Sequence, residues 1–205
     1  MSDSHQTSIR LPNPEKATLE GKNKFLGFWF FLGGETVLFG TLFATFLALR
    51  DKVASGPSGE ELFSMDITFI STMILLVSSL TSVFAVIAMK DYKVKKMQLW
   101  FWITILLGVS FLCLEIYEFT EYLGEGLGYK TSAFSSAFYT LVGTHGGHVL
   151  FGVLWISSLM VASYKKGITT VTAPKYYVAA LYWHFIDVVW VFIFTVVYLL
   201  GILGG

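Results

Sequence analysis

The sequence predicts an all-α, polytopic membrane protein built as a bundle of five transmembrane helices. Of its 205 residues, 55% are hydrophobic and only 14% are charged, whereas soluble domains average about 25% charged residues. The apolar residues gather in five stretches, each long enough to cross a hydrocarbon core that takes about 20 helical residues. These stretches are continuous rather than alternating, which excludes a transmembrane β-barrel.

The first 24 residues are expected to form a polar cytoplasmic tail. They contain four basic residues and two prolines and have no apolar run, so they lack the hydrophobic region of a cleavable signal peptide. Residues 25–205 are then expected to form a single membrane domain. Its spans are predicted at about 25–49, 67–89, 98–119, 133–164 and 176–203.

The basic residues predict the orientation of the bundle, because Lys and Arg near membrane spans are retained on the cytoplasmic side. Eleven of the fourteen lie in the tail, in the loop after the second span or in the loop after the fourth span. The other three are Arg50, Lys52 and Lys130. We therefore expect the N-terminus in the cytoplasm and the C-terminus outside.

Small residues predict where helices approach one another closely in lipid. Gly40, Ala44 and Ala48 follow one face of the first span, and Gly143 and Gly147 form a GxxxG pair in the fourth. Both spacings allow close contact between helix backbones.

Charge and cysteine content exclude several classes of function. Lys and Arg balance Asp and Glu, so the net charge is zero and the basic excess that nucleic acid binding requires is absent. The single cysteine, Cys113, excludes an intramolecular disulfide, a thiolate zinc cluster and a cysteine-ligated iron–sulfur centre.

Seven ionisable side chains fall inside the spans, where each costs a few kcal/mol unless it is paired or faces a cavity. Glu35 lies ten residues into the first span, about 15 Å deep, and has no ionisable neighbour in its own span. The other six form three pairs with i, i+3 spacing, so the members of each pair share a helix face. They are Glu115 and Glu118, His145 and His148, and His184 and Asp187.

These residues could serve more than one chemistry. Histidines and carboxylates are acceptable ligands for iron or zinc, and His145 with His184 could ligate a haem. The same side chains also form a hydrogen-bond network without a metal, in which the three faces converge and imidazoles donate to carboxylates. We favour this network and expect no metal or cofactor ligand among them. Glu35 is expected either to bond to a neighbouring helix or to handle protons or a lipid head group.

Four segments at these positions resemble subunit III of the haem-copper respiratory oxidases, in the short five-helix form of bacterial cytochrome c oxidases. The likeness runs from about Phe25 to Gly201. The segments are Gly33–Phe39 (GGETVLF), Glu115–Phe119 (EIYEF), Gly143–Val149 (GTHGGHV) and Tyr182–Trp190 (YWHFIDVVW).

The resemblance implies a subunit without its own redox centre, in a proton-pumping, oxygen-reducing enzyme of the bacterial plasma membrane. Haems and copper are then expected in partner subunits, with direct packing against subunit I and with subunit II and a small subunit IV in the complex. The implied roles are support of proton uptake, stability during turnover and binding of structural phospholipid. Glu35 matches the family's carbodiimide-reactive glutamate, and the six paired residues match its buried polar network.

Two other functions stay open. Subunit III of the related quinol oxidases is similar, so the electron donor could be a quinol. A free-standing proton or ion transporter could use Glu35 and Asp187 as relay groups. Against a transporter, the spans contain no inverted repeat and none is broken by proline.

Overall fold

The computed structural model describes residues 13–53 and 65–203, and within these ranges the chain is helical and has no strand. Five helices are long and apolar enough to cross a membrane, which confirms the predicted fold class. They are α1 (Leu19–Leu49), α3 (Met65–Lys90), α4 (Val94–Gly124), α5 (Ala133–Lys166) and α6 (Ala173–Ile193). Arg10, which the charge count places in the tail, lies outside the described residues.

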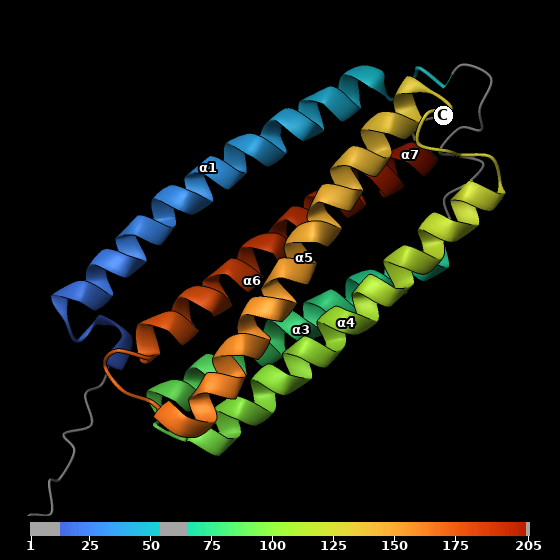
Figure 1. Cartoon of the computed structure of the whole chain (residues 1–205). Helices are drawn as coiled ribbons and strands as arrows, with labels where there is room; N and C mark the ends of the chain where they lie inside the picture. The colour runs from blue at the N-terminus through green and yellow to red at the C-terminus, as the bar shows by residue number, and fades with distance from the viewer. Residues whose placement is uncertain (1–12, 54–64, 204–205) are drawn as a thin grey trace, which may run out of the picture.

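Short elements extend the two ends of the bundle. A 3-10 turn, η1 (Pro14–Lys16), precedes α1, and a π-helical turn, η2 (Phe194–Leu199), continues α6 into α7 (Leu200–Leu203). The two ends of the described chain lie at opposite ends of the bundle (Figure 1), as an odd number of spans requires.

The helices reach beyond the apolar stretches because polar residues cap their ends. The Thr18 side chain accepts a hydrogen bond from the Gly21 N–H, so α1 begins six residues before the apolar stretch. At the start of α5, Ser132 and Ser135 form a reciprocal capping box. Such caps satisfy the first N–H groups of a helix, which have no partner within it.

Four of the helices form the core, and α1 lies outside them. α3, α4, α5 and α6 contact one another in a ring, whereas the main contacts of α1 are with α5 and α6. Figure 1 shows α1 in blue alongside α5 and α6 and away from the α3–α4 pair. Residues of α1 are accordingly the least buried of the five spans.

A tight turn joins α3 to α4. Tyr92 adopts a positive φ of 58°, and the Lys93 N–H donates to the Ala88 carbonyl, which is the pattern of a Schellman helix end. The Lys93 ammonium also donates to the Asp91 carboxylate at 2.7 Å. This hydrogen bond lowers the pKa of Asp91.

The core is built around Trp183 of α6, and glycines make room for its indole. A Cβ on Gly108 would lie 2.5 Å from Trp183 Cη2, and one on Gly152 would lie 3.1 Å from the same ring. The Trp183 indole N–H donates to Ser78 Oγ of α3 at 3.0 Å. One side chain of α6 therefore contacts three other helices, α3, α4 and α5.

The close helix approaches occur at glycines other than those expected. A Cβ on Gly40 or Gly147 would meet no other atom within 4 Å, and one on Gly143 would only reach Phe119 at 4.0 Å. The expectation for Gly40 and for the GxxxG pair was wrong because neither Gly40 nor Gly147 faces a neighbouring helix closely.

We predict that Gly108→Ala destabilises the folded protein by about 1–3 kcal/mol, because the added methyl group overpacks the Trp183 ring. Thermal unfolding of the purified protein in mild detergent, followed by size exclusion, measures this change. Gly40→Ala is the matched control, since its methyl group enters open space. Equal unfolding temperatures for the two variants would contradict the proposed packing.

Candidate functional site

Glu35 of α1 pairs with a histidine of α5. Its Oε2 lies 3.1 Å from Nε2 of His148, and the side chains are 17% and 21% exposed. Nδ1 of His148 lies 2.7 Å from the Thr144 carbonyl oxygen, one helical turn earlier. The sequence suggested no partner for Glu35 because His148 is 113 residues away.

The backbone of His148 is held by α6. The Tyr182 hydroxyl donates to the His148 carbonyl at 3.1 Å, and the Phe39 ring packs against the imidazole at 5.1 Å between centroids. A depression of about 340 Å³ exposes this region between α1 and α5; its lining includes Phe31, His148 and Tyr182. The Glu35–His148 pair thus lies at membrane depth beside an open lateral surface.

One member of the predicted pair on α6 bonds to a residue of α3 that the sequence did not single out. Nδ1 of His184 lies 2.8 Å from Ser79 Oγ of α3, and Asp187 lies three residues further along the same face of α6. Asp187 is 6% exposed, and its Oδ2 has no hydrogen-bond partner among the described residues. Ser79 therefore partners His184, and Oδ2 of Asp187 stays without a partner in the described part of the chain.

The two carboxyl groups of α4 have different surroundings. Glu118 Oε1 accepts hydrogen bonds from Thr68 of α3 at 3.0 Å and from the Tyr122 hydroxyl at 3.5 Å. Glu115 lies against α5, where its carboxyl occupies the space that a side chain at Gly146 would fill. Its Oε1 has no hydrogen-bond partner in the described part of the chain.

His145 is fully buried and is surrounded by aromatic rings. Its ring centroid lies 5.2 Å from that of Trp190 and 5.9 Å from that of Phe111. Neither ring nitrogen forms a hydrogen bond to another described residue. His145 and His184 therefore have different environments, one aromatic and one polar.

The six paired residues do not form one converging network. Within residues 13–53 and 65–203, the one direct imidazole–carboxylate hydrogen bond joins His148 to Glu35, whereas His184 and Glu118 bond to hydroxyl groups of α3. Imidazoles were expected to donate to carboxylates where the three faces converge, and this was wrong for Glu118, because its partner Thr68 lies on α3. The described residues also contain no group of three or more His, Cys, Asp and Glu side chains that could hold a metal ion.

Sequence reasoning missed the hydroxyl groups of α3 that bond to neighbouring helices. Thr68, Thr72, Ser78 and Ser79 each bond to a residue of α4 or α6. The sequence does show a high content of Ser and Thr in this otherwise apolar span. Hydroxyl groups can bond within their own helix, however, so composition did not show that they face neighbouring helices.

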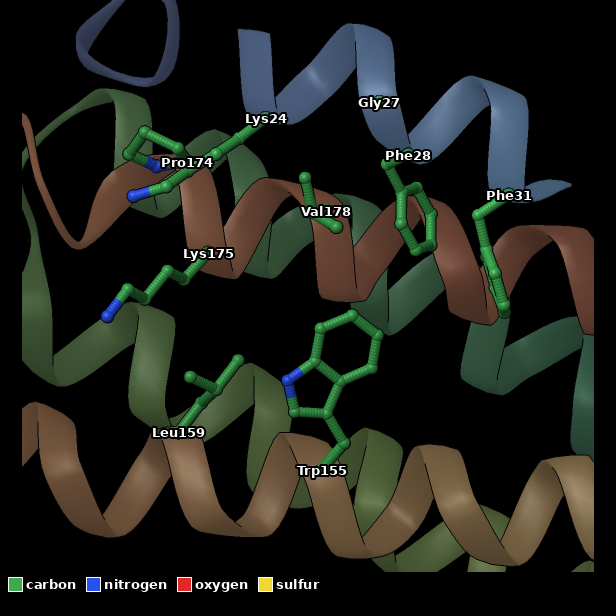
Figure 2. A pocket seen from close by; sticks show the side chains of 9 residues that line it. All are labelled: Lys24, Gly27, Phe28, Phe31, Trp155, Leu159, Pro174, Lys175 and Val178. Carbon is green, nitrogen blue, oxygen red and sulfur yellow. The ribbon is translucent and has the colours of Figure 1, made fainter. Parts of the chain in front are cut away.

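A groove of about 450 Å³ opens on the side of the bundle between α1, α5 and α6. Figure 2 shows the Lys24 and Lys175 ammonium groups at one end, and Phe28 and Phe31 toward the other, with the Trp155 indole facing across from α5. Phe31 also lines the depression beside the Glu35–His148 pair. The two hollows therefore adjoin along α1.

Comparison with known proteins gives consistent results over nearly the whole chain. The family model described as "Cytochrome c oxidase subunit III" matches residues 15–202. The "Cytochrome c oxidase subunit 3" of Bacillus sp. (strain PS3) is 69% identical over 192 residues, which is 93% of each chain. The protein of the same name from Bacillus subtilis (strain 168) is 65% identical over 193 residues, 94% of this chain and 93% of its own length.

A second group of relatives is less similar. The "Quinol oxidase subunit 3" of Bacillus subtilis (strain 168) is 49% identical over 185 residues, which is 90% of each chain.

We predict that two adjacent glycines differ in their tolerance of alanine. Gly146→Ala places a methyl group where the buried Glu115 carboxyl lies, so it displaces that carboxyl and costs about 1–3 kcal/mol of stability. Gly147→Ala adds its methyl group in open space and serves as the control. Thermal unfolding of both variants in detergent measures the difference, and equal loss in both would show that the Glu115 placement is wrong.

Proposed function

The chain belongs to the cytochrome c oxidase subunit III family, and from this premise we propose that it serves a bacterial proton-pumping oxidase supplied by cytochrome c. Within that enzyme it is the non-catalytic subunit that sustains proton uptake and stability during turnover. The observation that carries this role is the Glu35–His148 pair, which places a proton-sharing group at membrane depth.

The electron donor is proposed from sequence identity. The relatives named for cytochrome c oxidase are 69% and 65% identical, whereas the quinol oxidase relative is 49% identical. The quinol oxidase is the second candidate because its subunit III still matches 90% of the chain. A dinuclear copper site or an attached haem c in the neighbouring subunit II would distinguish cytochrome c from quinol as donor.

We assign the haems and copper to partner subunits, with this chain packed directly against subunit I and with subunit II and a small subunit IV in the same complex. The complex is placed in the bacterial plasma membrane, with residues 1–24 as a cytoplasmic tail and the C-terminus outside. The lysines in the loops after the second span (Lys90–Lys96) and after the fourth span (Lys165–Lys175) support this orientation.

The hydrogen bonds of His148 determine how many protons the pair holds. A backbone carbonyl only accepts, so the bond to Thr144 places a proton on Nδ1 of His148. The bond between Nε2 and Glu35 then requires one more proton between the two groups. That proton sits either on the carboxyl group or on the imidazole, and in both cases the pair is neutral overall.

A neutral pair explains how Glu35 is accommodated in the membrane and what it can do there. An unpaired charge at this depth is costly, and the shared proton removes that cost. The same proton can move between oxygen and nitrogen without a change in net charge. We therefore propose Glu35 as the proton-handling and carbodiimide-reactive carboxyl group, with His148 as its proton partner.

The groove of Figure 2 is proposed as the site of a structural phospholipid. Its walls are apolar and aromatic, while Lys24 and Lys175 lie together at one end. Basic residues at the membrane surface attract anionic head groups, and the aromatic walls suit an acyl chain. With the proposed orientation, the lysines lie on the cytoplasmic side and the acyl chain runs toward the Glu35–His148 pair.

We predict that Glu35→Gln leaves the haem spectra of the purified oxidase unchanged but lowers proton uptake or shortens the lifetime during turnover. The amide cannot share a proton with His148, whereas the haems and copper are assigned to partner subunits in the proposed complex. Proton uptake during oxygen reduction and the decay of activity with time measure the effect. Glu121→Gln, an exposed carboxyl of α4, is the control, and loss of the haem signal in Glu35→Gln would argue against the peripheral role.

We predict that replacing Lys24 and Lys175 together by Gln weakens the retention of anionic phospholipid. Each basic residue near the head group contributes about 1 kcal/mol, or about fivefold in the binding constant. Native mass spectrometry of the purified oxidase with phosphatidylglycerol measures the bound lipid. Lys22→Gln alters a lysine of the same helix end that does not line the groove; lipid loss equal to that of the double variant would refute the site.

A further inference from the structure

A second groove lies between α3 and α6, and the proposed function does not use it. We call it the α3–α6 groove; its volume is about 270 Å³, and its lining comes from these two helices. The groove of Figure 2 is lined instead by α1, α5 and the start of α6, and the two grooves share no lining residue. A molecule bound in one groove therefore does not occupy the other.

The walls of the α3–α6 groove suit a hydrocarbon chain. Four aliphatic side chains line its length: Val83, Val86, Ile87 and Leu181. Val83 and Ile87 are 40% and 50% exposed, so the groove is open toward the outside of the bundle. His184 lies at the inner end, where its Nδ1 is bonded to Ser79. It follows Tyr177, at the outer end, by seven residues, so the groove extends for about 10 Å along α6.

Hydrogen-bond donors lie at the outer end of the groove, where Lys90 ends α3. Lys90 Nζ is 3.6 Å from the Glu15 carboxylate, which is longer than a hydrogen bond. Its three N–H donors form no hydrogen bond to a described residue, and the side chain is 39% exposed. The Tyr177 ring centroid lies 5.8 Å from the same Nζ. The Tyr177 hydroxyl likewise forms no hydrogen bond within the described part of the chain.

The charges at the outer end leave an excess of one positive charge. Lys16 Nζ of η1 lies 6.0 Å from the Tyr177 ring centroid, so two ammonium groups gather at this ring. The buried Glu15 carboxylate, beside Lys90, offsets one of them. Asp91 is bonded to Lys93 at 2.7 Å and offsets that lysine instead. The phosphodiester of a phospholipid carries one negative charge, and its oxygens accept hydrogen bonds from ammonium groups. The outer end is therefore complementary to an anionic head group.

We propose that the α3–α6 groove binds one anionic phospholipid. Its phosphate lies at Lys90 and Tyr177, and one acyl chain lies along the aliphatic walls. Basic residues at the end of a pocket between transmembrane helices are the usual receptors of such head groups. The bound lipid connects three segments that are distant in the sequence: η1, the end of α3 and the start of α6.

The site is independent of the proposed function. The Glu35–His148 pair faces the depression between α1 and α5, and the lipid proposed for the groove of Figure 2 depends on Lys24 and Lys175. Neither depends on a residue of the α3–α6 groove. Failure of this proposal would therefore leave the proposed function of the subunit untouched.

The test is photolabelling of the purified oxidase with phosphatidylglycerol that carries a diazirine in its acyl chain. Mass spectrometry of the peptides should find the label on the α3 segment that contains Val83 and Ile87. Lys90→Gln should lower this labelling about fivefold, the contribution of one basic residue near a head group. Val83→Phe, which narrows the groove without changing its charge, should lower the labelling as well. Phosphatidylethanolamine with the same diazirine has no net charge, so its labelling should be weaker and should not respond to Lys90→Gln.

Lys93→Gln is the matched control, because Lys93 bonds to Asp91 and does not line the groove. It should be labelled like the wild type. Haem content of the same samples reports assembly, and Val83→Phe carries the test if Lys90→Gln does not assemble. The proposal is overturned if this segment of α3 takes up no label, or if Lys93→Gln lowers the labelling as much as Lys90→Gln. It is also overturned if a photoreactive residue placed at Val83 cross-links to a neighbouring subunit, since a protein then covers the groove.

Discussion

Ionisable side chains at membrane depth are stabilised by partners on neighbouring helices, because the hydrocarbon offers them no water. This constraint organises the bundle. Glu35 bonds to His148 across α1 and α5, Glu118 to Thr68 across α4 and α3, and His184 to Ser79 across α6 and α3. Each bond also sets the rotation of one helix against another, because a polar atom left unpaired would cost several kcal/mol in hydrocarbon.

α3 contributes more to this arrangement than its lack of mid-span charges suggests. Its hydroxyl groups bond to the indole nitrogens of Trp183 and Trp190 as well as to His184 and Glu118. Hydroxyl groups both donate and accept, so one helix can serve an imidazole, two indoles and carboxylates. Both α6 and α4 therefore form side-chain hydrogen bonds to the same helix, α3.

The position of α1 gives Glu35 and Asp187 different surroundings. Because α1 lies outside the four-helix core, its contact with α5 leaves the Glu35–His148 pair beside an open depression. Asp187, by contrast, is enclosed between α3 and α6. One carboxyl group thus lies near the lateral surface with an imidazole partner, and the other lies inside the bundle.

The number of helices and the membrane class follow from the sequence by itself, because the thickness of the hydrocarbon core sets the length of each apolar stretch. The sequence also identified which ionisable residues lie at depth, and the segment Tyr182–Trp190 indicated the family. Only the tertiary structure decided the partners. Glu35 and His148 are 113 residues apart, and Ser79 and His184 are 105 apart, so their contact depends on which helices are neighbours and how each is rotated. The choice of neighbouring helices and their rotation arise from packing around Trp183 and the glycines beside it. No local sequence pattern shows this packing.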